Sequence, residues 1–182
     1  MPRRTTPVPV ADTQLAELEQ LLGIRFQQGT FAAKRAQVAA LSEPYQAIEV
    51  LRGRVLDLFH AGLSAFVAAR GDAPHALYAL PAIDPLEVAQ LCEVGSHGGC
   101  SSVEVLQVLK QIQERSPFEV FFADAAGFKA RFLAPPSEAE ARRIEELVLD
   151  VCIDAINLID SDEPDYAQAI VLEKQSLELW WD

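Results

Sequence analysis

Apolar side chains recur at helical spacing in the first third of the chain. Leucines at every third or fourth position predict a helix over residues 13–23, and a second apolar stripe predicts another over residues 44–62. Pro44 suits the first turn of that second helix, and Gly62 suits its end. The stretch between them, residues 31–41, is rich in alanine and also favours a helix. The pattern therefore predicts a helical N-terminal region.

Four further helices are predicted in the rest of the chain. Asp84 begins a short helix that ends near Cys92. Ser101 and Ser137 each stand three residues before a glutamate, which is the spacing of a capping box, and an apolar stripe follows each of them. Pro164 has the position of a first-turn proline and predicts a helix of its own.

Short apolar runs bounded by turn residues predict the strands. They lie at residues 63–70, 75–83, 118–123, 128–133 and 176–181. The last four strands, with the helices between them, follow the order strand, helix, strand, strand, helix, strand. This is the split βαβ order of ferredoxin-like folds. We therefore predict an α+β fold of the ferredoxin-like type, with additional N-terminal helices.

The domain organisation follows from these elements. No linker or shift in composition divides the chain, so residues 1–182 are expected to form a single domain. Residues 1–12 are expected to be a flexible tail, residues 13–62 a helical N-terminal part, and residues 63–182 an α+β core.

Alternation along the predicted strands assigns side chains to the two faces of the sheet. One face receives the residues expected in the core, namely Phe118, Val120, Phe122, Phe128, Ala130 and Phe132. Trp181 points to the core in the same way. The other face receives a set that we predict to be an interaction surface: Phe121, Lys129, Arg131, Glu178 and Trp180. The alternative is that the N-terminal helices cover Phe121 and Trp180.

The chain is acidic, and its charge is unevenly distributed. The formal net charge is −12, and from Ser137 onward thirteen acidic residues stand against three basic ones. Because phosphate binding depends on lysine and arginine, we expect no nucleic-acid partner. A protein partner, most easily a basic one, or a homodimer is expected instead. The apolar runs are too short for a membrane span, and three cysteines are too few for a disulfide framework, so a cytoplasmic location away from membranes is predicted.

Potential metal ligands gather in the glycine-rich segment after the short helix. Cys92, His97 and Cys100 fall within nine residues, and these residue types bind zinc. Their spacing fits no common zinc motif, and a fourth ligand would have to come from Cys152, His60, His75 or a carboxylate. Cys100 with His97 or His75 is also a candidate nucleophile and base. We favour ordinary thiols and a loop histidine, and we predict no catalytic residue, metal or cofactor.

Several segments of the C-terminal half are distinctive together. They are the ending Leu179-Trp180-Trp181-Asp182, the helix that runs into a strand from Val105 to Phe122, the hairpin GFKARFLAPP, and the helix that reaches Cys152 before an acidic segment. In these features residues 84–182 resemble an uncharacterised bacterial family, a domain of unknown function whose members end in a Leu-Trp-Trp-Asp-like motif. The family's Gly-Thr-Asn-Gly-like loop takes the divergent form Gly95-Ser96-His97-Gly98 here. The resemblance implies a fold and a boundary but no activity.

Together these features favour a non-enzymatic module that binds another protein or a second copy of itself. One alternative is a small metal-dependent or cysteine-using enzyme built on residues 95–100, which requires a pocket with polar groups around that loop. Another is a toxin-neutralising immunity protein in which acidity mimics another ligand, which requires a basic toxin as the partner.

Overall fold

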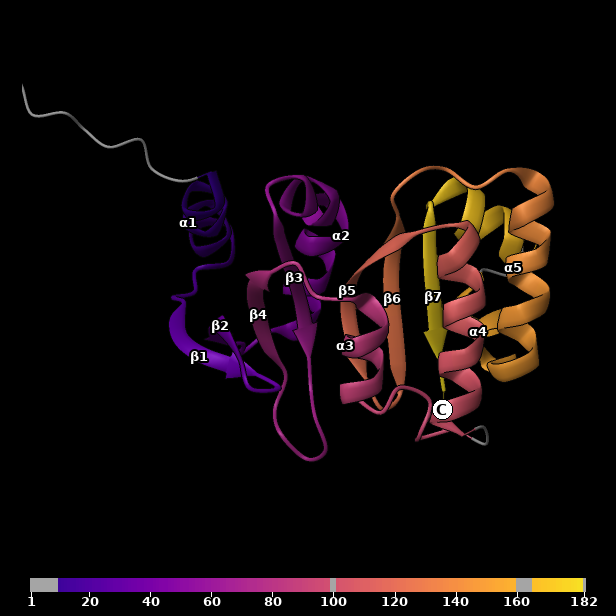
Figure 1. The fold of residues 1–182 in the computed structure, drawn as a ribbon, viewed down its shortest axis with the longest axis horizontal. Helices are drawn as coiled ribbons and strands as arrows, with labels where there is room; N and C mark the ends of the chain where they lie inside the picture. Colours follow the sequence, from indigo (N-terminus) through magenta and orange to yellow (C-terminus); the bar gives the residue numbers. More distant parts are fainter. Residues whose placement is uncertain (1–9, 99–100, 160–164, 182) are drawn as a thin grey trace, which may run out of the picture.

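A single mixed sheet of seven strands forms the centre of the computed structural model, which describes residues 10–98, 101–159 and 165–181 (Figure 1). The strand order is β1-β2-β4-β3-β5-β6-β7. β3 and β5 run parallel, and the other neighbouring pairs are antiparallel. The strands are β1 (Gln27–Phe31), β2 (Lys34–Ala40), β3 (Leu63–Ala68), β4 (Ala76–Pro81), β5 (Phe118–Asp124), β6 (Gly127–Phe132) and β7 (Ser176–Trp180).

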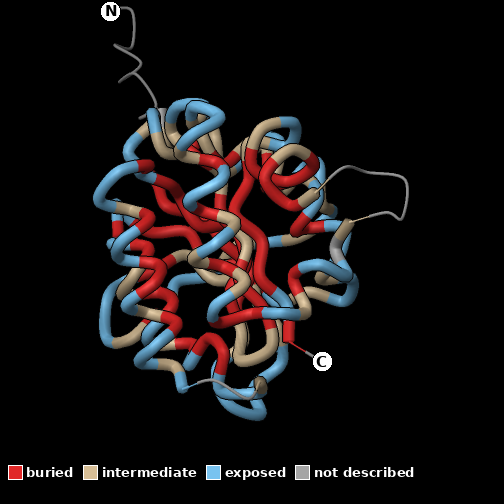
Figure 2. The backbone as a smooth tube through the Cα atoms, turned by 90° about the vertical axis from the view of Figure 1, so that its right-hand side faces the viewer, coloured by how far each residue is buried: buried red, intermediate tan, exposed pale blue. Residues whose placement is uncertain are grey.

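Helices cover both faces of this sheet. α1 (Val10–Leu22) and α2 (Pro44–His60) pack on one side, called the α2 face below. The opposite side, the α4 face, is covered by α3 (Pro85–Leu91), α4 (Ser102–Arg115), α5 (Glu138–Val151), the 3₁₀ segment η1 (Ile153–Leu158) and the π-helix η2 (Ala167–Glu173). Each face has its own hydrophobic core, and buried segments run through the middle of the molecule (Figure 2).

The prediction of a ferredoxin-like topology is not confirmed by the strand order. That topology would return the last strand beside the first, whereas β7 pairs with β6 at the edge, and β3 separates β4 from β5. All six residues of β3 are buried, so this strand is suited to the middle of a sheet and takes the place next to β5. The broader prediction of an α+β fold is confirmed.

The helix predicted over residues 31–41 is wrong, because this stretch belongs to the β1–β2 hairpin. Its turn is made by Ala32 and Ala33, both with positive φ angles, of 47° and 66°. Phe31 is buried against Phe66 and Tyr78, with ring centroids 5.0 and 4.9 Å away. Strand pairing and this aromatic contact outweigh the modest helix preference of alanine. The N-terminal part, residues 13–62, is therefore not wholly helical.

The predictions that rest on helix caps agree with the structure. Gly62 follows α2 with a φ of 81°, a left-handed conformation that glycine adopts without strain. Ser101 and Glu104 form the reciprocal capping box of α4, and the Ser137 hydroxyl accepts a hydrogen bond from the Glu140 backbone N–H in α5. The helix predicted to open at Pro164 starts outside the described residues.

A bulge in β5 changes the predicted distribution of aromatic side chains. Val120 is opposite Ala130, but Phe122 is opposite Lys129, so Phe121 is the extra residue. Alternation resumes in the opposite phase after the bulge, and Phe122 joins Phe121 on the α2 face. The prediction that Phe122 shares a face with Phe118 and Val120 is therefore wrong.

Candidate functional site

The five residues of the predicted interaction surface share the α2 face, but they are not equally accessible. Phe121 is 0% exposed and lies under α2, where the Arg52 guanidinium is 5.9 Å from its ring centroid. It is therefore a core residue. The Trp180 side chain is 36% exposed, and Lys129 and Arg131 are half-buried. We call the set Arg52, Lys129, Arg131, Glu178 and Trp180 the polar shelf.

Glu178 is the centre of the polar shelf. Its side chain is only 4% exposed, and it stands opposite Lys129 on the neighbouring strand. Arg52 Nη2 lies 3.3 Å from Glu178 Oε1, and Lys129 Nζ lies 3.4 Å from Oε2. These two cations offset the desolvation of the buried carboxylate, since removing either would leave the charge underpaired.

Cations outnumber carboxylates in the polar shelf. Arg131 Nη1 donates to the Arg52 carbonyl, 3.0 Å away, and so adds a third positive charge. The second carboxylate nearby is that of Glu49, whose Oε1 is 3.4 Å from Arg52 Nη2. Three cations and two carboxylates give a local charge of +1, whereas the whole chain carries −12.

The hydrogen bonding of the polar shelf is incomplete. In the described part of the chain, three of the five buried side-chain atoms without a hydrogen-bond partner belong to it: Arg52 Nε, Arg131 Nε and Glu178 Oε1. The contacts of the Glu178 carboxylate measure 3.3 to 3.5 Å, longer than the 2.7–2.9 Å or so typical of charge-assisted hydrogen bonds. Buried polar groups are normally satisfied, so this concentration of unpaired atoms distinguishes the shelf from the rest of the described chain.

Trp180 is fixed at the rim of the polar shelf by its backbone and its neighbours. Its carbonyl accepts a hydrogen bond from Cys152 Sγ at 3.0 Å. A Cβ atom at Gly127, the facing residue on β6, would come within 2.9 Å of both the Trp180 and the Phe122 rings. Glycine therefore allows the indole to lie flat against the strand.

The outer edge of β7 is closed beside the polar shelf. The buried Tyr166 hydroxyl donates to the Glu178 carbonyl at 2.7 Å and accepts from the Glu178 N–H at 3.0 Å. Burial raises the pKa of the Tyr166 phenol, so the hydroxyl stays protonated and keeps both bonds. An edge strand with free backbone groups can pair with another chain, and at Glu178 this hydroxyl prevents it.

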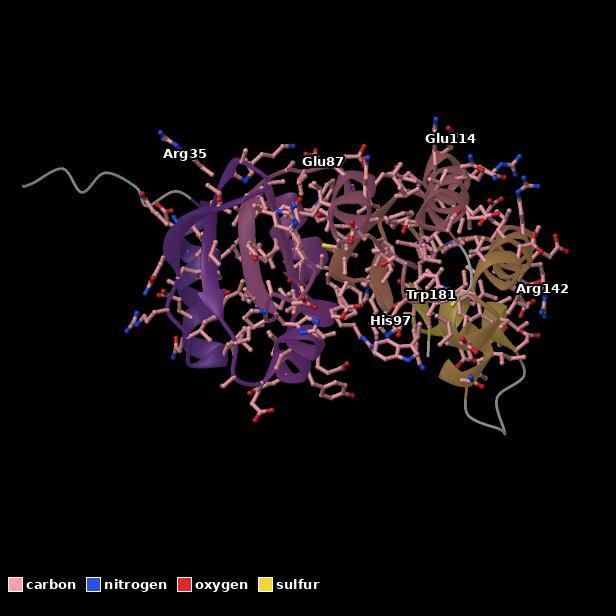
Figure 3. All side chains as sticks on the ribbon, turned by 90° about the horizontal axis from the view of Figure 1, so that it is seen from below. Arg35, Glu87, His97, Glu114, Arg142 and Trp181 are labelled. Atoms are coloured by element: carbon pink, nitrogen blue, oxygen red, sulfur yellow. The ribbon has the colours of Figure 1, made fainter. Side chains whose placement is uncertain are left out.

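A second region joins the glycine-rich loop to the end of the chain. The backbone N–H groups of Gly95 and His97 donate to the Ala125 carbonyl, at 3.1 and 3.3 Å. A side chain at Gly98 would collide with the Trp181 ring, whose Nε1 donates to the Val151 carbonyl at 3.0 Å. His97 and Trp181 accordingly lie close to each other in the view from below (Figure 3). The loop is thus a packing element around Trp181.

The structure describes two of the three residues proposed for a zinc site, Cys92 and His97. Cys92 is 1% exposed, and burial raises the pKa of its thiol to about 12, so it is protonated at neutral pH. His97 is exposed, and Cys100 lies outside the described residues. Among the residues that the structure does describe, no three His, Cys, Asp or Glu side chains are grouped as metal ligands would be.

Sequence reasoning named His75 only as a possible zinc ligand or base and missed its contact with Asp124 at the carboxyl ends of β3 and β5. His75 Nε2 lies 2.9 Å from Asp124 Oδ2, and its ring stacks on Phe122 at a centroid distance of 5.8 Å. Asp124 Oδ1 accepts from the Ala126 N–H, which fixes the carboxylate. In the sequence Asp124 is recognisable only as a turn residue. Its contact with His75 could not be predicted, because the two residues are forty-nine positions apart.

The fold and the polar shelf define an α+β protein with an open mixed sheet and a charged sheet face. Residues 76–182 match the family described as Domain of unknown function (DUF4253), and the chain belongs to this family. The comparisons with curated proteins and with solved structures gave no match. The matched region starts at β4 and omits β3, although β3 lies between β4 and β5 in the sheet. The N-terminal part therefore completes the sheet of the family region.

One further property concerns membranes. In the part of the chain that the structure describes, none of the helices is both long and apolar enough to span a bilayer.

Proposed function

We propose that the protein is a non-enzymatic module that binds another protein through the polar shelf. The observation that carries this proposal is the group of three buried, unsatisfied polar atoms beside the partly exposed Trp180 indole. Tryptophan and arginine are the residues that most often dominate the energy of protein interfaces. Here both are held in place before binding, which limits the entropy lost on association.

The described residues of the loop region serve packing. A nucleophilic cysteine needs an accessible thiolate, whereas Cys92 is buried and protonated. His75 is oriented by Asp124, but neither residue contacts a nucleophile in the described contacts. The loop from Gly95 to Gly98 is used for packing.

The proposal is tested by comparing partner recovery for three forms of the full-length chain: wild type, Trp180→Ala and Tyr45→Ala. Tyr45 is a suitable control because it is also aromatic, is 72% exposed and lies at the start of α2, outside the shelf. A partner that binds the shelf should be recovered equally with wild type and Tyr45→Ala and about tenfold less with Trp180→Ala. Unchanged thermal unfolding of the variants shows that the fold is intact. Equal recovery of every bound protein by all three forms would exclude the shelf as the contact surface.

A further inference from the structure

The charge of the polar shelf differs in sign from that of the whole chain. With the neighbouring Glu49 included, its net charge is +1, and its cations are largely buried: the side chains of Arg52 and Lys129 are 26% and 16% exposed. Charges shielded from water interact more strongly with an incoming ion than fully solvated ones do. An anionic group that reaches the shelf is therefore attracted locally, even though the chain as a whole repels it.

The unsatisfied atoms define the chemistry of that group. Arg52 Nε and Arg131 Nε are both donors, so each needs an acceptor. A carboxylate is an acceptor with two oxygens whose spacing matches a guanidinium fork. Glu178 does not serve both arginines, because its single negative charge is already shared between Arg52 and Lys129.

Trp180 adds an apolar platform at the rim of the same surface. Its indole offers a flat face beside the cations, and an aliphatic or aromatic side chain next to a carboxylate would fit both features. This combination suits a peptide segment better than a small inorganic anion, which would use the charge alone.

A second copy of this chain is a poor occupant of the polar shelf. A twofold dimer places the same patch of both subunits face to face, so two patches of like net charge would meet. Pairing through the edge of β7 at Glu178 is closed by the Tyr166 hydroxyl. Resting on the proposed function, we infer that the polar shelf recognises an acidic segment of a different protein, with a carboxylate placed between Arg52 and Arg131.

Nuclear magnetic resonance of the full chain labelled with ¹⁵N can test this inference. The chain has two tryptophans, so two indole N–H signals are expected. Trp180 reports on the shelf, and Trp181, whose indole is buried and bonded to Val151, is the internal control. The probes are octaglutamate, octaglutamine and octalysine peptides at low salt, where electrostatic binding is strongest.

Octaglutamate is expected to shift the Trp180 indole signal, and octaglutamine is not. In Arg131→Gln the apparent affinity for octaglutamate should fall about tenfold, because the peptide carboxylate loses the charged guanidinium that donates to it. The matched control is Arg25→Gln, which removes an arginine that is highly exposed and remote from the shelf, and it should leave the affinity unchanged.

Three other outcomes would overturn the inference in distinguishable ways. If octalysine shifts the Trp180 signal and octaglutamate does not, the shelf binds a partner but the acidic chemistry is wrong. If no peptide shifts it, and partner recovery is also independent of Trp180, both the inference and the proposed function fail. Concentration-dependent shifts of the Trp180 signal without peptide would instead identify a second copy as the occupant.

Discussion

The two faces of β7 give neighbouring tryptophans opposite environments. Trp181 points to the α4 face, where it is 3% exposed, donates to the Val151 carbonyl and packs against Gly98. Trp180 points to the α2 face and remains 36% exposed beside the charged residues of the polar shelf. The α4 face of strands β5 to β7 is an apolar core closed by helices, whereas their α2 face is only partly covered by α2.

This difference gives the two faces of one strand different expected roles. The residues facing α4 and α5 are fixed by packing, so changes there should act on stability. The residues facing the polar shelf lie in a partly solvated place, so changes there should act on binding with little effect on the fold. The experiments below test this division, beginning with the largest expected effect.

Trp181→Ala should be strongly destabilising. The substitution leaves a cavity beside Gly98 and removes the hydrogen bond to the Val151 carbonyl, so the free energy of unfolding should fall by about 3–5 kcal/mol. Urea denaturation followed by circular dichroism measures this loss. Trp181→Phe fills part of the cavity and should recover part of the stability. A loss no greater than that of Trp180→Ala would contradict the division between the faces.

Glu119→Gln tests the second of two buried glutamates in the sheet, the first being Glu178. Unlike Glu178, which has two cations beside it, Glu119 has Ser64 and the negative charge of Asp84 as its electrostatic neighbours. Burial is the main cause that raises the pKa of Glu119 from 4.5 to about 7; the nearby Asp84 raises it further, and a hydrogen bond with Ser64 opposes the rise. The folded state therefore favours the protonated carboxyl.

The sign of the pH effect follows from this raised pKa. The contribution of Glu119 to stability is fully present below pH 4.5, declines as the pH rises toward 7, and is lost above it. Glu119→Gln should remove this decline, so above pH 7 the variant should exceed wild type by on the order of 3 kcal/mol, and below pH 4.5 the two should be similar. Urea unfolding across this range, with the exposed Glu114→Gln as a control, measures the difference. Parallel pH profiles would show that Glu119 keeps its ordinary pKa.

Tyr166→Phe tests the closure of the β7 edge. The ring is retained, but the N–H and the carbonyl of Glu178 both lose their partner, which should cost about 2 kcal/mol of stability. The opened edge should also allow strand pairing between copies, visible as association at high concentration by light scattering. A variant that stays monomeric at concentrations where wild type is monomeric would mean that other features protect this edge.

Trp180→Ala should have the smallest effect on the fold. Because the indole is partly exposed, its removal should lower the free energy of unfolding by less than about 1 kcal/mol while weakening partner binding. Thermal unfolding and partner recovery are measured on the same preparation. A loss of stability close to that of Trp181→Ala would show that the shelf is part of the core.

The helices were predictable because their signals are local. The capping serine Ser101 and the terminating glycine Gly62 act on neighbouring backbone groups, so the sequence alone contains the relevant chemistry. The β1–β2 hairpin was missed because its stability comes from pairing with β4 and from aromatic contacts with β3 and β4. The place of β3 beside β5 likewise depends on contacts distant in sequence.

The candidate site was only partly predictable for the same reason. Alternation placed Lys129, Glu178 and Trp180 on one face because the pairing of β6 with β7 is regular. It could not reveal the bulge that turns Phe122 to the same face. The burial of Phe121 and the contribution of Arg52 both depend on how α2 crosses the sheet. The incomplete hydrogen bonding of the polar shelf is a property of the assembled structure.

The packing of the glycine-rich loop makes its two central positions exchangeable. Gly95 and Gly98 are constrained by the space around Val105 and Trp181, and the loop is attached through backbone hydrogen bonds to Ala125. Ser96 and His97, between the glycines, have exposed side chains. The two glycines should therefore be needed for packing. Substitution or chemical labelling of the two residues between them should leave the fold unchanged.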